Sequence, residues 1–261
     1  MRTVYQQDRD RIVFSNSFRR LKHKTQVFLS PLGNHYRTRL THTLEVAEVA
    51  RTISRAMRLN EDLAEPLPWP MISGIRLSGI RVKPRSRKFF HRIFSHNIQS
   101  LRVVDILERH GNGLNLTYEV QDGSIKHSKG FGNILPTNDT EKACTVEGQI
   151  VRVADIIAYL NHDLDDAIRS GVITRVQLPA SCPGVLGKSH SERATTMIRD
   201  LIYTSRLDQD RVELRLSPPV FAAMTDLREF LYEKVYRSQR VHAGIYQSQK
   251  NDFGNLFLFS G

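Results

Sequence analysis

The stretch EGQIVRVADIIAYLNHDLDDAI, residues 147–168, decides the fold class. Its apolar residues recur at three- and four-residue intervals, which is typical of a helix with one buried face. They are Ile150, Val153, Ala154, Ile157, Leu160, Leu164, Ala167 and Ile168. Gly171 follows as a helix stop. The pattern therefore predicts a long amphipathic helix over residues 147–169.

Segments on either side of this stretch show the same period. Residues 39–57 predict a second helix, and residues 97–109 predict a third that ends at Gly111. Two more helices are expected at 189–206 and 217–237. Strand signals are few and short, so the sequence predicts an all-α fold.

Composition restricts the class of protein without choosing a function. The chain has 261 residues, enough for one large domain or for two small ones. Its net charge of +11 favours nucleotides, nucleic acid or a membrane surface as partners. No apolar run of about twenty residues is present and the start lacks the order of a signal peptide, so we expect a cytoplasmic protein without membrane contact. Cys144 and Cys182 have no CxxC spacing, which favours inert, reduced thiols over a zinc site.

Four segments carry a resemblance to a known family. They are SFRRLKHKTQVF (17–28), RLTHTLEVAEVARTISRAMRLNEDLAE (39–65), HNIQSLRVVDILE followed by GLNLTYEV (96–120), and residues 147–168. In this order they resemble the deoxyguanosinetriphosphate triphosphohydrolase-like proteins, dNTP triphosphohydrolases of the HD phosphohydrolase superfamily. The resemblance implies an HD-type helical domain over 1–245. It also implies hydrolysis of a deoxynucleoside triphosphate to deoxynucleoside and triphosphate, by metal-assisted attack of water at the α-phosphorus.

The superfamily holds a divalent metal such as Mg or Mn with a His, an adjacent His-Asp dyad and a distant Asp. His42 and Asp155 match the first and last of these ligands. Imidazoles and carboxylates bind divalent ions, which polarise phosphate oxygens and water. Without the match, a lone His on an amphipathic helix is more often an ordinary core or surface residue. Asp155 stands among apolar residues, where an unpaired carboxylate is costly to bury, and this supports a site.

The resemblance also implies four further site residues. Gln26 would contact the deoxyribose, Arg39 the phosphate and Tyr159 the sugar, while His96 would orient or protonate groups near the triphosphate. Arg39 precedes His42 by three residues and shares its helical face, within reach of a phosphate held there. The ordinary alternatives are a loop amide, a surface ion pair and a core aromatic for Gln26, Arg39 and Tyr159.

The central His-Asp dyad is missing from its expected place. Where the family has a run like ALAHDLGHTPFGHTGE, residues 66–83 read PLPWPMISGIRLSGIRVK, and residues 66–95 contain no acidic residue. The family's run reappears when the codons for these residues are read one base out of register. The Trp69–Pro70 junction forces Ala and Met71–Ile72 forces Asp, while permitted bases elsewhere complete IALAHDLGHTPFGH.

We therefore expect a one-base slip near residues 64–66, repaired before His96, which makes 66–95 an out-of-frame segment. At the other end, QSQKNDFGN permits RAKRMILG in another frame, similar to the family's last helix, so 246–261 is interpreted as a non-native tail. With two of four metal ligands left, we expect weak metal binding and impaired hydrolysis.

Two further interpretations complete the sequence analysis. His162-Asp163 is an intact His-Asp pair, but it lies about 10 Å along the helix from Asp155, too far to share one ion with it, and is set aside as the dyad. The alternative function is a non-catalytic protein that uses its basic surface for single-stranded nucleic acid or as an oligomer partner. On either view we expect a homo-oligomer.

Overall fold

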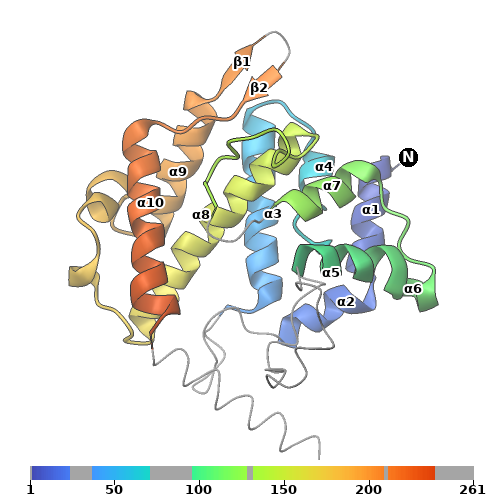
Figure 1. Cartoon of the computed structure of the whole chain (residues 1–261), viewed down its shortest axis with the longest axis horizontal. Coiled ribbons are helices and arrows are strands. Elements are labelled where there is room, and N and C mark those ends of the chain that lie inside the picture. Colours follow the sequence, from blue (N-terminus) through green and yellow to red (C-terminus); the bar gives the residue numbers. More distant parts are fainter. Residues whose placement is uncertain (1, 24–36, 71–95, 128–131, 209–210, 239–261) are drawn as a thin grey trace, which may run out of the picture. The chain divides into compact units, whose positions relative to one another are not determined.

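The computed structural model describes residues 2–23, 37–70, 96–127, 132–208 and 211–238 (Figure 1). Its α-helices are α1 (Val4–Val13), α2 (Asn16–Arg19), α3 (Arg39–Ala56), α4 (Glu61–Ala64), α5 (His96–Arg102), α6 (Glu108–Gly111), α7 (Tyr118–Lys126), α8 (Val146–Arg169), α9 (His190–Thr204) and α10 (Pro218–Leu231). Shorter 3-10 and π-helical turns are η1 (Arg20–His23), η4 (Val103–Leu107), η5 (Arg175–Gln177), η6 (Cys182–Leu186) and η7 (Tyr232–Tyr236). Strands β1 (Arg206–Asp208) and β2 (Arg211–Glu213) pair antiparallel. The predicted all-α fold is confirmed.

The long predicted helices are present with nearly the predicted bounds. The helix predicted over 147–169 is α8 (Val146–Arg169). Those predicted over 39–57 and 189–206 are α3 (Arg39–Ala56) and α9 (His190–Thr204), and residue 206 begins β1 instead. The third and fifth predicted helices each contain a π-helical turn, η4 or η7. Helix α8 ends as its glycine predicts, because Gly171 has a φ of 68° and the Val172 N–H donates to the Ala167 carbonyl at 3.1 Å.

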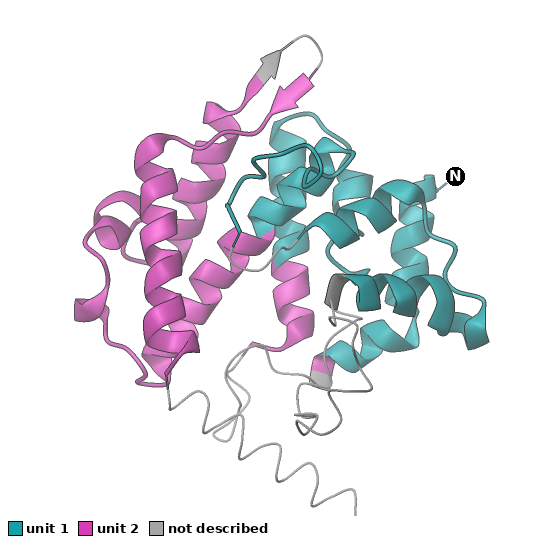
Figure 2. Cartoon of the chain, viewed as in Figure 1, with its two compact units in different colours: residues 1–21, 46–154 teal, residues 22–45, 155–261 magenta. Residues whose placement is uncertain are grey.

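The chain divides into two compact units (Figure 2). Unit 1 comprises Met1–Leu21 and Val46–Ala154, and unit 2 comprises Lys22–Glu45 and Asp155–Gly261. Helices α3 and α8 each pass from one unit into the other. The single domain expected over 1–245 stays a prediction.

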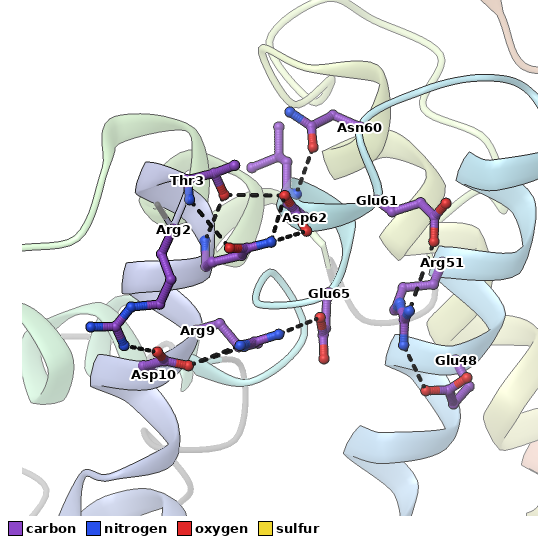
Figure 3. Close-up of polar contacts among 12 residues, drawn as sticks. Arg2, Thr3, Arg9, Asp10, Glu48, Arg51, Asn60, Glu61, Asp62 and Glu65 are labelled. Carbon is purple, nitrogen blue, oxygen red and sulfur yellow. Dashed lines mark hydrogen bonds and ion pairs between the residues drawn. The ribbon is translucent and has the colours of Figure 1, made fainter.

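Unit 1 has an apolar core and polar contacts between its short helices. Its largest fully buried side chains are Ile12, Leu21, Ile53, Leu67, Leu114, Ile134 and Ile150. On its surface, Asp62 of α4 accepts hydrogen bonds from Thr3, the N-cap of α1, at 3.1 Å and from Gln6 of α1 at 3.0 Å (Figure 3). Thr3 and Gln6 also form a capping box at the start of α1. Short helices that bury little apolar surface are thus fixed by their caps and by cross-helix polar contacts.

Unit 2 packs the second half of α8 with α9 and α10. Its fully buried side chains include Ile157, Leu160, Leu164, Leu186, Met197, Leu201, Met224 and Leu227. Buried Arg193 of α9 donates to Asn161 Oδ1 at 3.1 Å and to Asp165 Oδ1 at 2.8 Å, both on α8. Burial disfavours the charge of Asp165, but the His190 hydrogen bond and the Arg193 charge outweigh it and lower the pKa of Asp165. This polar cluster fixes the register of α9 on α8.

Cys144 is exposed and Cys182 is buried, and both are free thiols. Within the described residues, no helix combines the length and the apolar character needed to cross a bilayer.

Alanine substitutions at two glycines with left-handed backbone angles allow the cost of backbone strain to be compared with the cost of a steric clash. Gly113 and Gly171 have φ of 67° and 68°, but a Cβ on Gly113 would lie 2.0 Å from the Asp105 carbonyl oxygen, whereas nothing lies within 4 Å at Gly171. We expect Gly171→Ala to cost about 1 kcal/mol of unfolding free energy from strain alone. Gly113→Ala should cost about 1–3 kcal/mol more because of the clash. Urea unfolding of both variants tests this, and equal losses would contradict it.

Candidate functional site

The residues matched to the first and last metal ligands lie together in unit 2. His42 is on α3 and Asp155 is on α8, and His42 Nε2 lies 3.0 Å from Asp155 Oδ1. Two ligand atoms about 2.1 Å from one ion, at right angles, are also about 3 Å apart. The pair is therefore spaced either for a direct hydrogen bond or for neighbouring positions on one ion.

The described residues do not make up a complete metal site. Among them, no group of three or more His, Cys, Asp or Glu side chains could hold a metal ion. The segment that would supply the dyad falls mostly in 71–95, which lies outside the described residues, as do Gln26 and the 246–261 tail. His96 begins α5, in unit 1, and its side chain is not among those described.

Two more predicted residues lie on the same helices. Arg39 is the first residue of α3, and among the described residues its half-buried guanidinium has no ion-pair partner. Burial lowers the pKa of Arg39. Tyr159 lies one turn after Asp155 on α8, and burial raises the pKa of Tyr159 against the opposing charge of Arg228. An arginine that has no counter-charge among the described residues can bind an anion.

A series of polar contacts extends from His42 in the direction opposite to Asp155. His42 Nδ1 lies 2.7 Å from His162 Nε2, and both rings are buried, 5% and 0% exposed. His162 Nδ1 approaches Asp163 Oδ1 to 2.9 Å without hydrogen-bonding alignment. The other oxygen of Asp163 accepts from the hydroxyl of Tyr236 on η7.

Burial and neighbouring charges shift the pKa values of His162 and Tyr236 in this series of contacts. Burial disfavours protonation of His162, but the neighbouring Asp163 outweighs it and raises the pKa of His162. Burial, together with Asp163, raises the pKa of Tyr236 well above its usual value. Tyr236 therefore stays neutral and can donate to Asp163.

Sequence reasoning set aside His162 and Asp163 and did not single out Arg228 or Tyr236. The structure agrees that His162 and Asp155 do not face one position, because they meet opposite nitrogens of His42. A signal for His162 and Asp163 is present in the sequence. Polar residues at 155, 159, 162, 163 and 166 fall at helical spacing, a polar stripe along an otherwise apolar helix.

Comparisons with known proteins find relatives that match most of the chain. The chain is 59% identical over 250 residues to a deoxyguanosinetriphosphate triphosphohydrolase-like protein of Desulfatibacillum aliphaticivorans, covering 96% of this chain and 71% of that protein. Proteins of the same name are 49% identical in Caldanaerobacter subterraneus subsp. tengcongensis (90% and 66% covered) and 43% identical in Clostridium tetani (91% and 67%). No family model matches the chain.

Fold and site together define a class of all-α protein with a buried polar site of His and Asp side chains on two helices. Within that class, the chain belongs to the family of deoxyguanosinetriphosphate triphosphohydrolase-like proteins.

Removing the hydroxyl of Tyr236 tests how much its hydrogen bond to the buried Asp163 contributes to stability. We expect Tyr236→Phe to cost about 1–3 kcal/mol of unfolding free energy, because the buried Asp163 carboxylate loses its donor. Tyr203→Phe is the matched control, since Tyr203 is 77% exposed, and it should change stability by less than about 0.5 kcal/mol. Thermal and urea unfolding measure both; similar small effects would show that the hydroxyl adds nothing.

Proposed function

We propose that the site in unit 2 is a deoxynucleoside triphosphate site of the family's type, left incomplete in this chain. The complete form would hydrolyse a dNTP of the dGTP kind to deoxynucleoside and inorganic triphosphate. Water adds to the α-phosphorus, the bond to the 5′ oxygen breaks, and the deoxynucleoside leaves with a proton on that oxygen. As it stands, this chain carries out the reaction poorly or not at all.

One observation carries the proposal. His42 and Asp155 are 113 positions apart in the sequence, and their side-chain atoms lie 3.0 Å apart. A His and an Asp from two helices, side by side and largely buried, suit a divalent ion better than they suit a core.

Arg39 adds a reason to expect a phosphate. Holding a guanidinium half-buried without a carboxylate among the described residues has an energetic cost, and an anionic ligand removes it. Arg39 lies on α3 one turn before His42, so a triphosphate beside His42 would be within its reach. Tyr159, one turn after Asp155, offers a ring for the sugar.

The proposed impairment follows from the ligand count. A divalent ion in such a site supplies Lewis-acid polarisation of phosphate and water, worth several kcal/mol. His42 and Asp155 supply two donors, and the dyad is absent from the sequence as it is read. We therefore assign no catalytic step to this chain, and attribute the missing dyad to the one-base slip proposed for 66–95.

Restoring the reading frame tests the proposal directly. The repaired gene carries a one-base change near codons 64–66, compensated before codon 96, so that this region encodes IALAHDLGHTPFGH. We expect the repaired protein to release triphosphate from dNTPs about 10³-fold faster than the present chain, since several kcal/mol of barrier are regained. Rates with Mg²⁺ or Mn²⁺ and each dNTP measure this. Equal rates would contradict the impairment, and inactivity of both would contradict the proposed site.

Substitution of Arg39 separates a ligand-binding role from a structural one. Arg39→Gln should change the unfolding free energy of the present chain by less than about 0.5 kcal/mol, because no ion pair among the described residues is lost. In the repaired protein it should lower kcat/KM about 10- to 100-fold, the value of one or two charged hydrogen bonds.

Arg193→Gln is the control for that comparison, since Arg193 is buried and bonded to Asn161 and Asp165. It should lose about 3 kcal/mol of stability. If Arg39→Gln behaves in the same way and leaves kcat/KM unchanged, Arg39 is a structural residue.

A further inference from the structure

Asn112 is followed by Gly113, the single Asn-Gly pair in the sequence. The side-chain amide of an asparagine is lost when the backbone nitrogen of the next residue attacks Cγ. Glycine hinders that attack least, because it has no Cβ. This pair is therefore the point in the sequence where deamidation is chemically easiest, and the conformation of the chain around it decides whether the reaction proceeds.

Deamidation at this position consumes water and releases ammonia. The Gly113 nitrogen gives up its hydrogen and bonds to Cγ of Asn112, and the side-chain nitrogen leaves as ammonia. Water then opens the resulting succinimide ring at either carbonyl. The product is aspartate, or isoaspartate, in which the backbone runs through Cβ.

The backbone of Asn112 holds the two reacting atoms apart. Its φ is −91° and its ψ is −10°. With ψ close to zero, the Gly113 nitrogen eclipses the backbone nitrogen of Asn112, whereas closure of the ring requires it to eclipse Cβ. The chain must rotate about the Cα–C bond of Asn112 before the ring can form.

Hydrogen bonds within the turn oppose that rotation. The N–H of buried Gly113 donates to the Glu108 carbonyl at 3.0 Å, so the attacking nitrogen is engaged and shielded from a base in the solvent. The side-chain amide of exposed Asn112 donates to the Arg109 carbonyl at 3.0 Å. Both reacting groups must leave these partners before they can react.

The turn also stores backbone strain. Arg109 and His110 have φ of 52° and 58°, in the left-handed region that residues with a Cβ disfavour. Unwinding releases this strain, so residues 108–114 need less free energy to open than an unstrained turn with the same hydrogen bonds. Opening of this segment alone frees both reacting groups of the Asn-Gly pair.

We infer that Asn112 is a latent deamidation site, unreactive while the turn of residues 108–114 is closed and reactive when that turn opens. The inference stands apart from the proposed function, because the turn belongs to unit 1 and the proposed site to unit 2.

Reaction at Asn112 changes the turn permanently. The carboxylate of aspartate cannot donate to the Arg109 carbonyl, and isoaspartate adds an atom to the backbone between the bonded groups. Neither product restores the original hydrogen bonds. Glu108, at the start of the turn, accepts hydrogen bonds from the backbone N–H groups of Asn16 and Ser17 at 3.3 and 2.7 Å, so the change also loosens α2.

Mass spectrometry of the full chain, incubated folded at mildly alkaline pH, tests the inference. The reference is a synthetic peptide of residues 110–126, the tryptic fragment that contains the pair, in the same buffer. Fragment ions of this peptide locate the gain in mass at position 112. We expect the folded chain to react at least about 100-fold more slowly than the peptide, because two hydrogen bonds worth about tenfold each must break. Equal rates overturn the inference.

Three variants test whether the turn opens by itself. Arg109→Gly removes the strain at one position, so the turn should open less often and deamidation of the folded chain should slow about threefold to tenfold. Arg20→Gly is the matched control, since it removes the same charge from an exposed residue with an ordinary φ of −70°, and it should leave the rate unchanged. Asn112→Gln should abolish the gain in mass at position 112.

Each outcome supports or overturns the inference. An unchanged rate in Arg109→Gly, or an equal change in Arg20→Gly, shows that the turn does not open by itself and overturns it. A gain in mass in Asn112→Gln as fast as in the parent chain places the reaction elsewhere and also overturns it. Urea unfolding checks that the glycine variants fold; if Arg109→Gly does not, the comparison of the parent chain with the peptide decides.

Discussion

Buried polar side chains on α8 are the constraint on which unit 2 depends. Each must find a partner, because an unpaired polar group in the interior costs about 1–3 kcal/mol. Asn161 is bonded by Arg193 of α9, His162 by His42 of α3, and Asp163 by Tyr236 of η7. Three successive residues thus reach three different elements. Apolar burial drives these helices together, but the polar partners select which helix lies where and in what register.

Much of the fold was predictable because the long helices bury one continuous face. The period of apolar residues over 147–169 predicts α8 and Gly171 predicts its end, and neither depends on distant parts of the chain. Helices α1 and α4 were not predicted because they are short and their stability comes from contacts made after folding. Asp62 of α4 accepts a hydrogen bond from Thr3, the N-cap of α1, which is 59 positions away, and no local pattern contains that information. The β1–β2 hairpin was missed because three-residue strands carry almost no alternation.

The site residues also divide into those that the sequence identifies and those that only the tertiary structure shows. Resemblance selected His42, Asp155, Arg39 and Tyr159, and the structure describes all four within unit 2. His162 was judged only by its distance from Asp155 along α8, and on that measure it is unrelated to the site. Its relation to the site passes through His42 on another helix. Side chains two turns apart on one helix can be linked by a third residue from a second helix, and spacing within one helix cannot reveal this.

The same network gives the two residues matched to the family's metal ligands partners within the protein. A structural ion contributes folding free energy when its ligands have no other partners. Here both nitrogens of the His42 imidazole lie within hydrogen-bonding distance of a partner, His162 at 2.7 Å and Asp155 at 3.0 Å. The cost of burying these groups is thus offset by the protein itself. The loss of the dyad that we propose would therefore leave His42 with partners in the core. Membership of the family follows from sequence identity over most of the chain, whereas the activity has to be argued from the site, as in the proposed function.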